Sequence, residues 1–452
     1  MSKPDAQELE AIARHRADLA QQGVHYVFAQ FTDIHGAAKG KLIPLSKLED
    51  VVYPGAGFSG PSIWGTGLPR NGPRSEYYGR ADLATLQAMP WMPGYARVAL
   101  DGYVAGQPFA GCPRQILRRQ VARLAQRGWT LQAGLEPEFF LLERGSVDAE
   151  PGDRLEKPSY DSKSLLRRRG FLEKLAASLD ACGLDVFQID HEDASGQFEL
   201  NYRYADALKA ADNFMLFKMA AHHLAEEEGM LLSMMPKPFA DRPGSGLHCH
   251  VSITDDEGGQ VFAGAADDAR GLALSPLAYQ FLAGLLHHAP ALTALCAPTV
   301  NSYKRLMCGQ SLSGTSWAPA FSAYGDNNRT VVARVVYQRI EWRLPDSAAN
   351  PYLVLAGVIA AGLDGIERGL DPGEPVNADV YEMSAAERAA LGLPMLPQNL
   401  GVAVEALRAD ALLGAALGQE FIAEYAALKS AEWLEYSQHV SAWETARYLD
   451  RF

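Results

Sequence analysis

The sequence lacks the features that mark a membrane-spanning, secreted or nucleic-acid-binding protein. No apolar run approaches the roughly 20 residues that a membrane-spanning helix needs. The chain has 41 Lys and Arg against 54 Asp and Glu, and its net charge of −13 argues against a surface for nucleic acid or anionic lipid. Because the first residues are polar and charged, we expect no secretory signal peptide. We therefore expect neither a membrane nor a nucleic acid among its partners.

Cysteine is scarce, and its spacing argues against a disulfide framework. No two cysteines form a CxxC pair, and their number is odd. Dispersed cysteines of this kind are typical of reduced thiols, so we expect a cytoplasmic protein. The five are Cys112, Cys182, Cys249, Cys296 and Cys308.

Internal repeats, low-complexity tracts and the Walker motif GxxxxGK[ST] are also absent, and the last absence excludes a P-loop enzyme. The composition is that of an ordinary globular protein, with 48% hydrophobic and 21% charged residues. A chain of 452 residues can bury a large core and is long enough for two or more domains.

The pattern of the chain changes near residue 108, where we place a domain boundary. Residues 1–107 read as strands and loops, and residues 108–452 alternate helices with strands. The loop at 53–75 is rich in Gly, Pro and Ser but holds aromatics, so we expect it to be ordered and packed against another surface, such as a second subunit. The expected helices cover 5–22, 114–126, 161–182, 206–228, 272–296, 351–369 and most of 402–449, and the expected strands cover 24–31, 39–52, 134–143, 186–189, 230–235, 247–253 and 331–344.

Two acids interrupt the apolar run GLEPEFFLLE at residues 134–143. Glu136 and Glu138 are two residues apart, so a strand turns both to one face. Two buried carboxylates side by side cost several kcal/mol unless a cation compensates. On its own, the run is equally well explained as an edge strand with solvated acids.

Two later segments also bring charge or imidazole to one face. In HEDASGQFE (191–199), Glu192 and Glu199 would face opposite ways on one continuous strand, but a bend or bulge at Gly196 can bring both inward. In PGSGLHCHV (243–251), His248 and His250 share a strand face. A solvated hairpin and core histidines are the simpler readings of each segment alone.

A fourth segment, RIEWR (339–343), repeats the period of two. Arg339, Glu341 and Arg343 share one face. The same part of the chain is dense in arginine, a residue that binds phosphates and carboxylates through its forked donors. The cluster comprises Arg305, Arg329, Arg334, Arg339 and Arg343.

The four segments together predict a metal site. Carboxylates with one or two imidazoles suit Mg²⁺ or Mn²⁺ better than structural zinc, and five glutamates suffice for two or more ions. Metals beside an arginine cluster indicate phosphoryl transfer from a nucleotide with a carboxylate substrate nearby. A two-metal hydrolase would use the same carboxylates, and hydrolysis of a phosphoester without ATP would favour it.

These residues resemble the glutamine synthetase family. The segments named above occur in the family's order together with NSYKRL (301–306), NNRT (327–330) and RIEWRLPDSAANPYL (339–353). The resemblance implies an α+β fold with an N-terminal β-grasp domain, residues 1–107, and a large catalytic α/β domain, residues 108–452. In that fold antiparallel strands line a metal-binding funnel. It also implies a homo-oligomer, a dodecamer of two hexameric rings, in which the next subunit's N-terminal domain completes each site.

The resemblance assigns roles to individual residues. It implies that an ATP-dependent ligase activates the γ-carboxylate of L-glutamate as γ-glutamyl phosphate, which an amine then attacks, with two or more Mg²⁺ or Mn²⁺ ions per site. The implied metal ligands are Glu138, Glu192 and Glu199 for one ion and Glu136, His248 and Glu341 for the second. The implied ATP-binding residues are Tyr204, His250, Ser252, Arg334 and Arg339. The implied glutamate-binding residues are Gly244, Arg305 and Arg343, and Arg329 is the catalytic residue near the transferred phosphate.

The sequence departs from the family where ammonium would bind. Ser59 replaces the Asp of the N-terminal loop, and Ser311 stands where the family has a flap glutamate. Glu76 keeps a carboxylate nearby and is our candidate for the residue that accepts the amine's proton. Because ammonium favours anionic ligands and each buried CH₂ contributes roughly 0.8 kcal/mol, we interpret the two serines as an amine pocket for an alkylamine.

We expect methylamine to be the acceptor, because the loops resemble the branch of glutamate–methylamine ligases and type III glutamine synthetases and the segment EDASGQFE favours the former. Ammonium and a larger amine remain alternatives. A ligase that has lost its activity and now acts as a regulatory or binding protein is an alternative of another class. The complete set of six metal-ligand positions argues against it.

Overall fold

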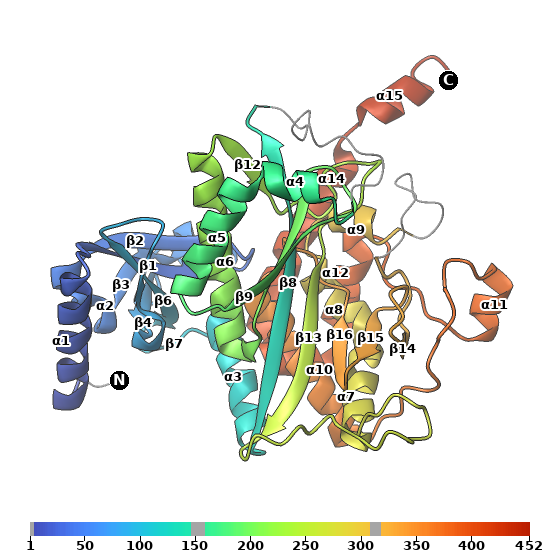
Figure 1. Ribbon diagram of the computed structural model, residues 1–452, viewed down its shortest axis with the longest axis horizontal. Helices are drawn as coiled ribbons and strands as arrows, with labels where there is room; N and C mark the ends of the chain where they lie inside the picture. Colours follow the sequence, from blue (N-terminus) through green and yellow to red (C-terminus); the bar gives the residue numbers. More distant parts are fainter. Residues whose placement is uncertain (1–3, 146–158, 308–317) are drawn as a thin grey trace.

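The computed structural model describes residues 4–145, 159–307 and 318–452, and within them two β-sheets organise the chain (Figure 1). All strands of the first sheet lie before residue 109, and all strands of the second lie after residue 128. The division into domains at residue 108 stays a prediction, and Pro108 is the last residue of the first sheet.

The N-terminal sheet mixes parallel and antiparallel pairs. Its path is β2-β1-β6-β4-β3, with β5 and β7 also paired to β6, and β1 runs parallel to β6. The central strands bury their side chains, and the first helix begins at a capping box of Asp5 with Glu8. The strands are β1 (Tyr26–Thr32), β2 (Ala38–Pro44), β3 (Ala56–Ser59), β4 (Glu76–Ala81), β5 (Gln87–Ala88), β6 (Tyr95–Val104) and β7 (Gln107–Pro108), and the helices α1 (Ala6–Gln21) and α2 (Leu48–Val52) accompany them.

The large sheet is built around its longest strand, β8. The path is β14-β15-β16-β13-β8-β10-β9, with β11 and β12 also paired to β8. Along the first half of β8 alternate residues are buried, as the period of two predicts, so one face joins the core and the other carries polar side chains. The strands are β8 (Trp129–Glu143), β9 (Val186–His191), β10 (Gln197–Tyr202), β11 (Ala205–Asp206), β12 (Met230–Ser233), β13 (Leu247–Asp255), β14 (Tyr324–Asp326), β15 (Ala333–Val336) and β16 (Arg339–Trp342).

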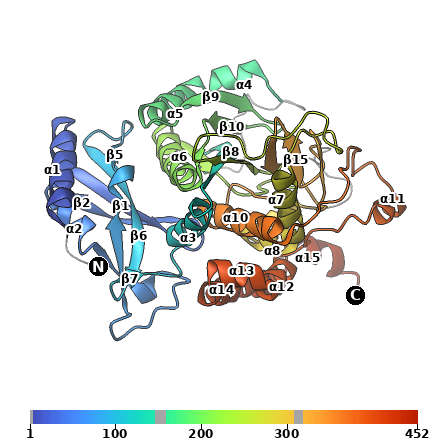
Figure 2. The same cartoon turned by 90° about the horizontal axis from the view of Figure 1, so that it is seen from below.

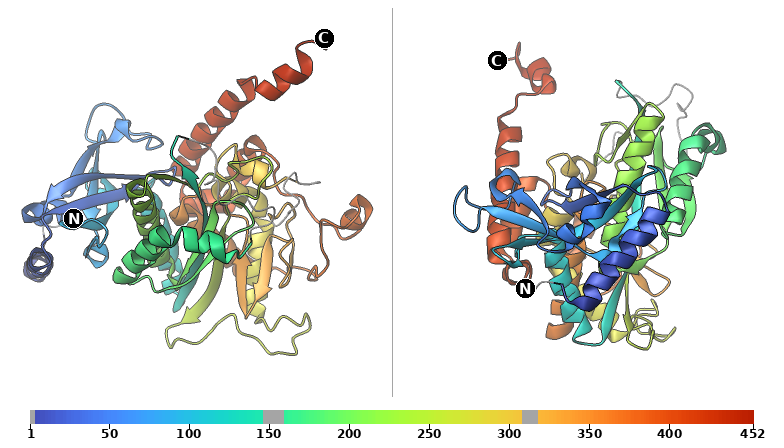
Figure 3. Two further views of the ribbon diagram at one scale, coloured as in Figure 1. Left: turned by 45° about the horizontal axis from the view of Figure 1, so that its top comes forward. Right: turned by 90° about the vertical axis from the view of Figure 1, so that its left-hand side faces the viewer.

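Helices pack against the apolar face of this sheet. Figure 2 shows α10 lying between α3 and α7, and α12 to α14 form a further layer beyond it. In Figure 3 the C-terminal part of α14 and the short α15 extend away from the rest of the molecule, whereas the first half of α14 is packed in this layer. The helices are α3 (Pro113–Ala125), α4 (Ser162–Arg167), α5 (Arg169–Ala181), α6 (Ala207–Glu227), α7 (Pro276–His287), α8 (Ala289–Cys296), α9 (Ser302–Arg305), α10 (Pro351–Arg368), α11 (Ala385–Ala390), α12 (Leu400–Ala409), α13 (Ala411–Leu417), α14 (Gln419–Gln438) and α15 (Ala442–Tyr448).

Several expected elements need correction. The strand expected over 39–52 ends at Pro44, where a short 3-10 turn leads into α2, because proline cannot continue the ladder. The helix expected over 272–296 is divided into α7 and α8, and Pro290 lies in the first turn of α8. The helix over 161–182 is likewise divided, into α4 and α5.

The Gly-rich loop at 53–75 packs on α14 of the same chain. A Cβ added to Gly65 would lie 2.7 Å from Leu428, and one added to Gly67 would lie 2.7 Å from Glu424. The expectation of an ordered, packed loop is therefore met within one chain. Cys112, Cys182, Cys249 and Cys296 are free thiols, as predicted, and Cys308 lies outside the described residues. None of the helices in the described ranges is long and apolar enough to cross a membrane.

The His288 imidazole, between α7 and α8, links three helices and gives a testable pH dependence. It is 6% exposed, and its nitrogens lie 2.6 Å from Asp410 and 3.0 Å from Asp364. Although burial opposes it, the hydrogen bonds that the His288 imidazolium donates to these two aspartates raise the pKa of His288. A raised folded-state pKa adds stability below the unfolded value of 6.5, and this stability is lost as the pH rises through the folded value.

We expect the melting temperature of the wild type to fall more steeply between about pH 6.5 and pH 9 than that of His288→Gln. Thermal unfolding at constant ionic strength measures the two slopes. His287→Gln is the matched control, because burial lowers the pKa of the neighbouring His287. Parallel curves for wild type and His288→Gln would contradict the assignment.

Candidate active site

A cavity of about 960 Å³ opens on the polar face of the large sheet. Its size suits a nucleotide together with a small substrate. The described residues that line it all follow residue 128. They include the acids Glu136, Glu138, Glu192, Asp193, Glu199 and Glu341, the bases His248, Lys237, Lys304, Arg305, Arg329, Arg334 and Arg343, and the residues Ser159, Tyr160, Gln197, Gly244, Gly246 and Asn301.

Pairing of β8 with β13 places the first two acids beside the predicted histidines. His248 lies directly opposite Glu136 in the antiparallel register. Glu138 accepts hydrogen bonds from the Gly246 amide at 2.8 Å and from Gln197 Nε2 at 3.1 Å. A Cβ on Gly246 would lie 3.0 Å from both Glu138 and His248, so glycine permits this close approach. Glu136 and Glu138 do share one face, as the spacing predicts.

Glu192 and Glu199 reach the cavity through a hairpin. The chain turns between β9 and β10, with Gly196 at a φ of +75°, and the Glu192 amide donates to the Gln197 carbonyl at 2.9 Å. The predicted bend at Gly196 is therefore a reversal between two strands. β10 pairs with β8 so that Glu199 lies directly opposite Glu138.

Glu341, on β16, is 1% exposed and holds two arginines. Arg334 donates to one of its oxygens at 2.6 Å, and Arg343 donates to the other at 2.5 Å. Although burial opposes it, the charges of Arg343 and Arg334 lower the pKa of Glu341 to about 2. This carboxylate is therefore ionised at all physiological pH values.

In contrast to Glu341, the acids Glu192 and Glu199 have raised pKa values. Burial and the neighbouring Glu138 raise the pKa of Glu192 to about 8, and burial with Glu136 and Glu192 raises that of Glu199 well above its usual range. Burial, followed by Arg343, lowers the pKa of His248, which leaves a neutral imidazole. Crowded carboxylates beside a neutral imidazole are a donor set for a divalent cation.

Two groups of side chains are close enough to hold an ion. Ligand atoms of Glu136, Glu199 and His248 lie within 4.8 Å of one another, and so do those of Glu136, His250 and Glu341. These groups contain four of the six implied ligands, Glu136, Glu199, His248 and Glu341, together with His250, whereas Glu138 and Glu192 belong to neither group. One Glu138 oxygen accepts from both Gly246 and Gln197, and the other lies 3.9 Å from His248 Nε2. All six implied ligands line the one cavity.

The three residues implied for glutamate, Gly244, Arg305 and Arg343, all line this cavity. Arg305 is buried and donates to the Leu344 and Arg343 carbonyls at 3.0 Å each, which fixes its guanidinium. A Cβ on Gly244 would lie 3.2 Å from Arg305. Arg329, implied to act at the transferred phosphate, lines the same cavity and is exposed to solvent.

Two of the residues implied for ATP, His250 and Ser252, follow His248 along β13. His250 Nε2 lies 3.0 Å from Glu136, and Arg339 Nε lies 2.9 Å from His250 Nδ1. A Cβ added to Gly134 would lie 3.5 Å from the Tyr204 Cβ and 3.7 Å from the His250 Cβ, so these two side chains flank the glycine. Ser252 follows on the same face of β13. Of this group, Arg334 lines the cavity itself, and the others lie beside it or further along the strand.

The structure brings Ser59 and Glu76 together but does not bring them to this cavity. They lie directly opposite each other in the β3–β4 pair, on the N-terminal sheet, and both are exposed. Glu76 accepts a hydrogen bond from the Tyr78 hydroxyl at 2.6 Å. Within one chain, neither residue contributes to the cavity. Ser311 lies outside the described residues.

Several cavity residues were not predicted from the sequence. Gln197 shares a strand face with Glu199, so its period of two was a usable signal. Ser159, Tyr160, Asp193 and Lys237 stand in loops, where no periodicity marks them. Among these, Lys237 is fixed by Asn301, which accepts from its amide at 2.7 Å.

The chain is similar to known ligases along nearly its whole length. A glutamate–methylamine ligase from Methyloversatilis universalis is 50% identical over 437 residues, covering 96% of this chain and 98% of the relative. A glutamine synthetase from Rhizobium leguminosarum bv. phaseoli is 39% identical over 445 residues, covering 98% of this chain and 99% of the relative.

Solved structures agree with these relatives. A structure titled as a GmaS/ADP complex in conformation 1 matches with a TM-score of 0.90 at 40% identity, and one titled as apo GmaS without ligand matches with 0.88 at 39%. Each covers 96% of this chain and 99% of the solved one. Residues 110–448 match the family model described as "Glutamine synthetase, catalytic domain". With its acid-lined cavity and its arginine cluster, the chain belongs to the glutamine synthetase family.

Proposed function

We propose that this protein is an ATP-dependent ligase that joins the γ-carboxylate of L-glutamate to methylamine, giving γ-glutamylmethylamide. The observation that carries the choice of amine is the 50% identity over 96% of the chain to a glutamate–methylamine ligase, against 39% for a glutamine synthetase. Ser59 in place of an acid, at the position implied for ammonium, supports the same choice.

The reaction has two steps. An oxygen of the glutamate γ-carboxylate attacks the γ-phosphorus of ATP, and ADP leaves. The amine nitrogen then attacks the γ-carbonyl carbon, phosphate leaves, and the nitrogen loses a proton. Mg²⁺ or Mn²⁺ bound by the cavity acids would neutralise charge on the phosphate oxygens.

The chain's own residues orient the reactants. Arg305, held by two backbone carbonyls, presents a fixed guanidinium to the carboxylates of glutamate, and Arg343 stands beside it. Arg329 is placed at the cavity to stabilise charge on the transferred phosphoryl group. Preorganised donors of this kind accelerate a reaction because they need no rearrangement when charge develops.

The amine step requires a second chain in this proposal. Ser59 and Glu76 face solvent from the N-terminal sheet, away from the cavity of their own chain. In a ring of subunits, this exposed strand pair would enter the cavity of a neighbour and supply its amine pocket, with Glu76 accepting the amine's proton. We propose a dodecamer of two hexameric rings and a cytoplasmic location.

Ammonium is the second candidate acceptor. Glutamine synthetases at 39% identity share almost the whole chain, and Glu76 retains one carboxylate near the proposed amine site. In this case Glu76 and water would bind ammonium without the missing acids.

Phosphate release from ATP with Mg²⁺, glutamate and a panel of amines tests the proposal. The panel holds ammonium, methylamine, ethylamine, isopropylamine, putrescine and aniline, with mass spectrometry of the products. We expect kcat/KM for methylamine to exceed that for ammonium by about tenfold or more, and Ser59→Asp to reduce the ratio, because an acid favours the smaller cation. Glu76→Gln should lower kcat and alter its pH dependence.

The remaining outcomes separate the alternatives. A higher kcat/KM for ammonium would make the protein a glutamine synthetase. No amine-dependent phosphate release would favour a regulatory or binding protein, and phosphoester hydrolysis without ATP would favour a two-metal hydrolase. An unchanged kcat and pH profile in Glu76→Gln would remove Glu76 from its proposed role.

A further inference from the structure

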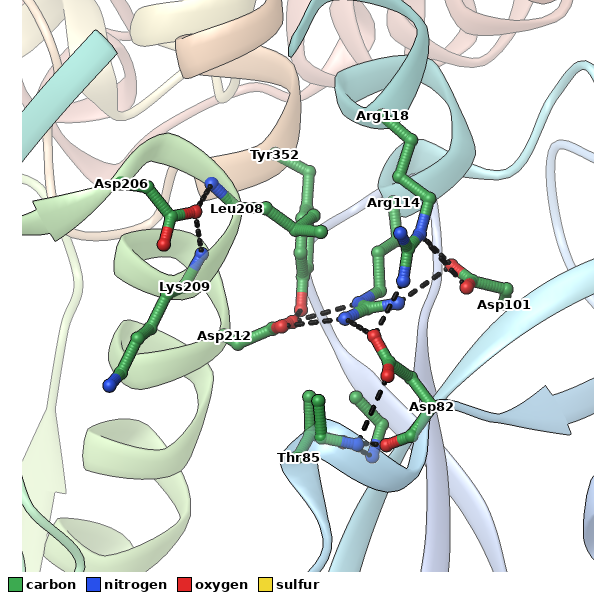
Figure 4. Close-up of polar contacts among 12 residues, drawn as sticks. Asp82, Thr85, Asp101, Arg114, Arg118, Asp206, Leu208, Lys209, Asp212 and Tyr352 are labelled. Atoms are coloured by element: carbon green, nitrogen blue, oxygen red, sulfur yellow. Dashed lines mark hydrogen bonds and ion pairs between the residues drawn. The ribbon is translucent and has the colours of Figure 1, made fainter. Parts of the chain in front are cut away.

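A cluster of buried ions joins the N-terminal sheet to helices of the large domain (Figure 4). Arg114, in the first turn of α3, is 2% exposed. Its guanidinium donates a pair of hydrogen bonds to Asp212 of α6, at 2.9 and 2.7 Å. The same guanidinium donates to Asp101 of β6 and to Asp82, which directly follows β4, at 2.8 Å each. One side chain therefore contacts both parts of the molecule.

Neighbouring groups complete the cluster. Arg118, one turn later on α3, donates to Asp82 at 2.5 Å and forms an ion pair with Asp101 at 2.9 Å. On the other side, the Tyr352 hydroxyl of α10 donates to Asp212 at 2.6 Å. Figure 4 shows Arg114 at the centre, with Asp212 on one side and Asp82 and Asp101 on the other.

The geometry depends on the shape of the arginine side chain. A planar guanidinium directs its donors along fixed lines, so three carboxylates around it are held at fixed angles to one another. An ammonium group is a point charge with rotatable donors and fixes no such angles. Arg114 thus sets an orientation as well as a distance.

The strand that Arg114 holds is the one that carries the proposed amine residues. Glu76 begins β4 and Asp82 follows its last residue, so about 20 Å of extended chain separates them. β4 pairs with β6 so that Arg80 lies opposite Asp101, and with β3 so that Ser59 lies opposite Glu76. A tilt of about 3° over that length would move Glu76 by about 1 Å.

We propose that Arg114 is a positioning residue for the amine step: by fixing the angle of β4 against α6, it places Ser59 and Glu76 in the cavity of a neighbouring chain. This inference rests on the proposed function and on the shared amine pocket described under it. Misplacement of a reacting group by 1 Å can cost up to about a hundredfold in rate.

The proposal separates the two steps of the reaction. Every described residue that lines the cavity belongs to the part of the chain after residue 128, so the proposed contacts to ATP and glutamate do not involve the N-terminal sheet of the same chain. Weakening the Arg114 cluster should therefore impair capture of the amine and spare formation of ADP. A purely structural role would impair both steps together.

The experiment compares Asp82→Asn, Arg114→Lys and Arg127→Gln with the wild type, all as assembled enzyme with Mg²⁺. Asp82→Asn keeps the Arg114–Asp212 pair, so it loosens only the connection to β4 and remains informative if Arg114→Lys does not fold. Arg127 is the matched control, because it follows α3 and pairs with Glu367 of α10 at 2.6 Å without touching the N-terminal sheet. The measured quantities are KM for methylamine, KM for glutamate, and the burst of ADP formed from ATP and glutamate without amine.

In Asp82→Asn and Arg114→Lys, we expect KM for methylamine to rise about tenfold or more while KM for glutamate and the ADP burst change less than about twofold. Arg127→Gln should match the wild type in all three quantities. An unchanged KM for methylamine in Asp82→Asn, or an equal loss in both steps, overturns the inference. A wild type without amine-dependent turnover overturns the proposed function instead, so the two failures are distinguishable.

Discussion

Replacing Glu199 by Gln should lower kcat by about three orders of magnitude. The same change should raise the melting temperature of the metal-free protein, measured in EDTA. Glu199 lies opposite Glu138, and one of its oxygens lies within 4.8 Å of ligand atoms of Glu136 and His248. A carboxylate in this position neutralises part of the charge of a bound cation, and an amide cannot do this because it is uncharged. Metal-dependent phosphoryl transfer should therefore be lost. Turnover with saturating Mg²⁺, ATP, glutamate and amine measures this loss.

The stability effect has the opposite sign because Glu199 is destabilising without a cation. Burial, Glu136 and Glu192 raise its pKa well above the usual range, so its ionised form is unfavourable in the folded protein at neutral pH. The amide introduced by Glu199→Gln would still accept from Asn201, which donates to the Glu199 carboxylate at 2.8 Å, but it would carry no charge. The melting temperature in EDTA should rise, and the further increase on adding Mg²⁺ should be smaller than in the wild type.

A glutamate of the same sheet serves as the control. Glu143, at the exposed end of β8, lies outside the cavity, so Glu143→Gln should leave both turnover and the response to Mg²⁺ unchanged. A Glu199→Gln variant that retained the wild-type increase in melting temperature with Mg²⁺ would show that Glu199 is not a metal ligand.

The period of two was sufficient to predict four side chains that line the cavity, namely Glu136, Glu138, His248 and Glu341. Strand geometry alone places Glu136 and Glu138 on one face, and both line the cavity. The pairing between strands was not predictable in the same way. That His248 lies opposite Glu136 depends on the register of β8 with β13, which is set by packing of residues distant in sequence.

Local rules also failed where tertiary structure decides between two allowed conformations. Glycine at 196 permits either a bulge or a reversal, and the structure has a hairpin because β9 and β10 can then both join the sheet. Loop residues such as Tyr160 carry no periodic signal, although this residue lines the cavity. The assignment of Ser59 and Glu76 to an amine pocket remains a prediction, because a single chain keeps them on another sheet.

The same chemical change at Glu341 should lower stability as well as activity. Glu341 is buried like Glu199, but Arg334 and Arg343 donate to its two oxygens at 2.6 and 2.5 Å. Glu341→Gln would leave these arginines without their shared anion, and breaking a buried pair in this way costs about 3 kcal/mol of unfolding free energy. Loss of an implied metal ligand should also lower kcat by about two to three orders of magnitude.

The pH dependence of unfolding gives an independent test of whether the ionised Glu341 stabilises the folded protein. Because its folded pKa is lowered from 4.5 to about 2, the ionised Glu341 contributes stability above the unfolded value, and this contribution is lost as the pH falls from 4.5 toward 2. Chemical denaturation at fixed protein concentration, between pH 3 and pH 7, should show a steeper loss on acidification for the wild type than for Glu341→Gln.

Glu367→Gln is the control for a pair that solvent screens. Glu367 accepts from Arg127 at 2.6 Å, yet both side chains are more than one third exposed, so its loss should cost less than about 1 kcal/mol. If Glu341→Gln were as stable as Glu367→Gln, the two arginines would not depend on Glu341 for their charge balance. We expect the two variants to change stability in EDTA in opposite directions, with Glu199→Gln more stable and Glu341→Gln less stable than the wild type. That result would show that arginines neutralise Glu341, whereas Glu199 requires a bound cation.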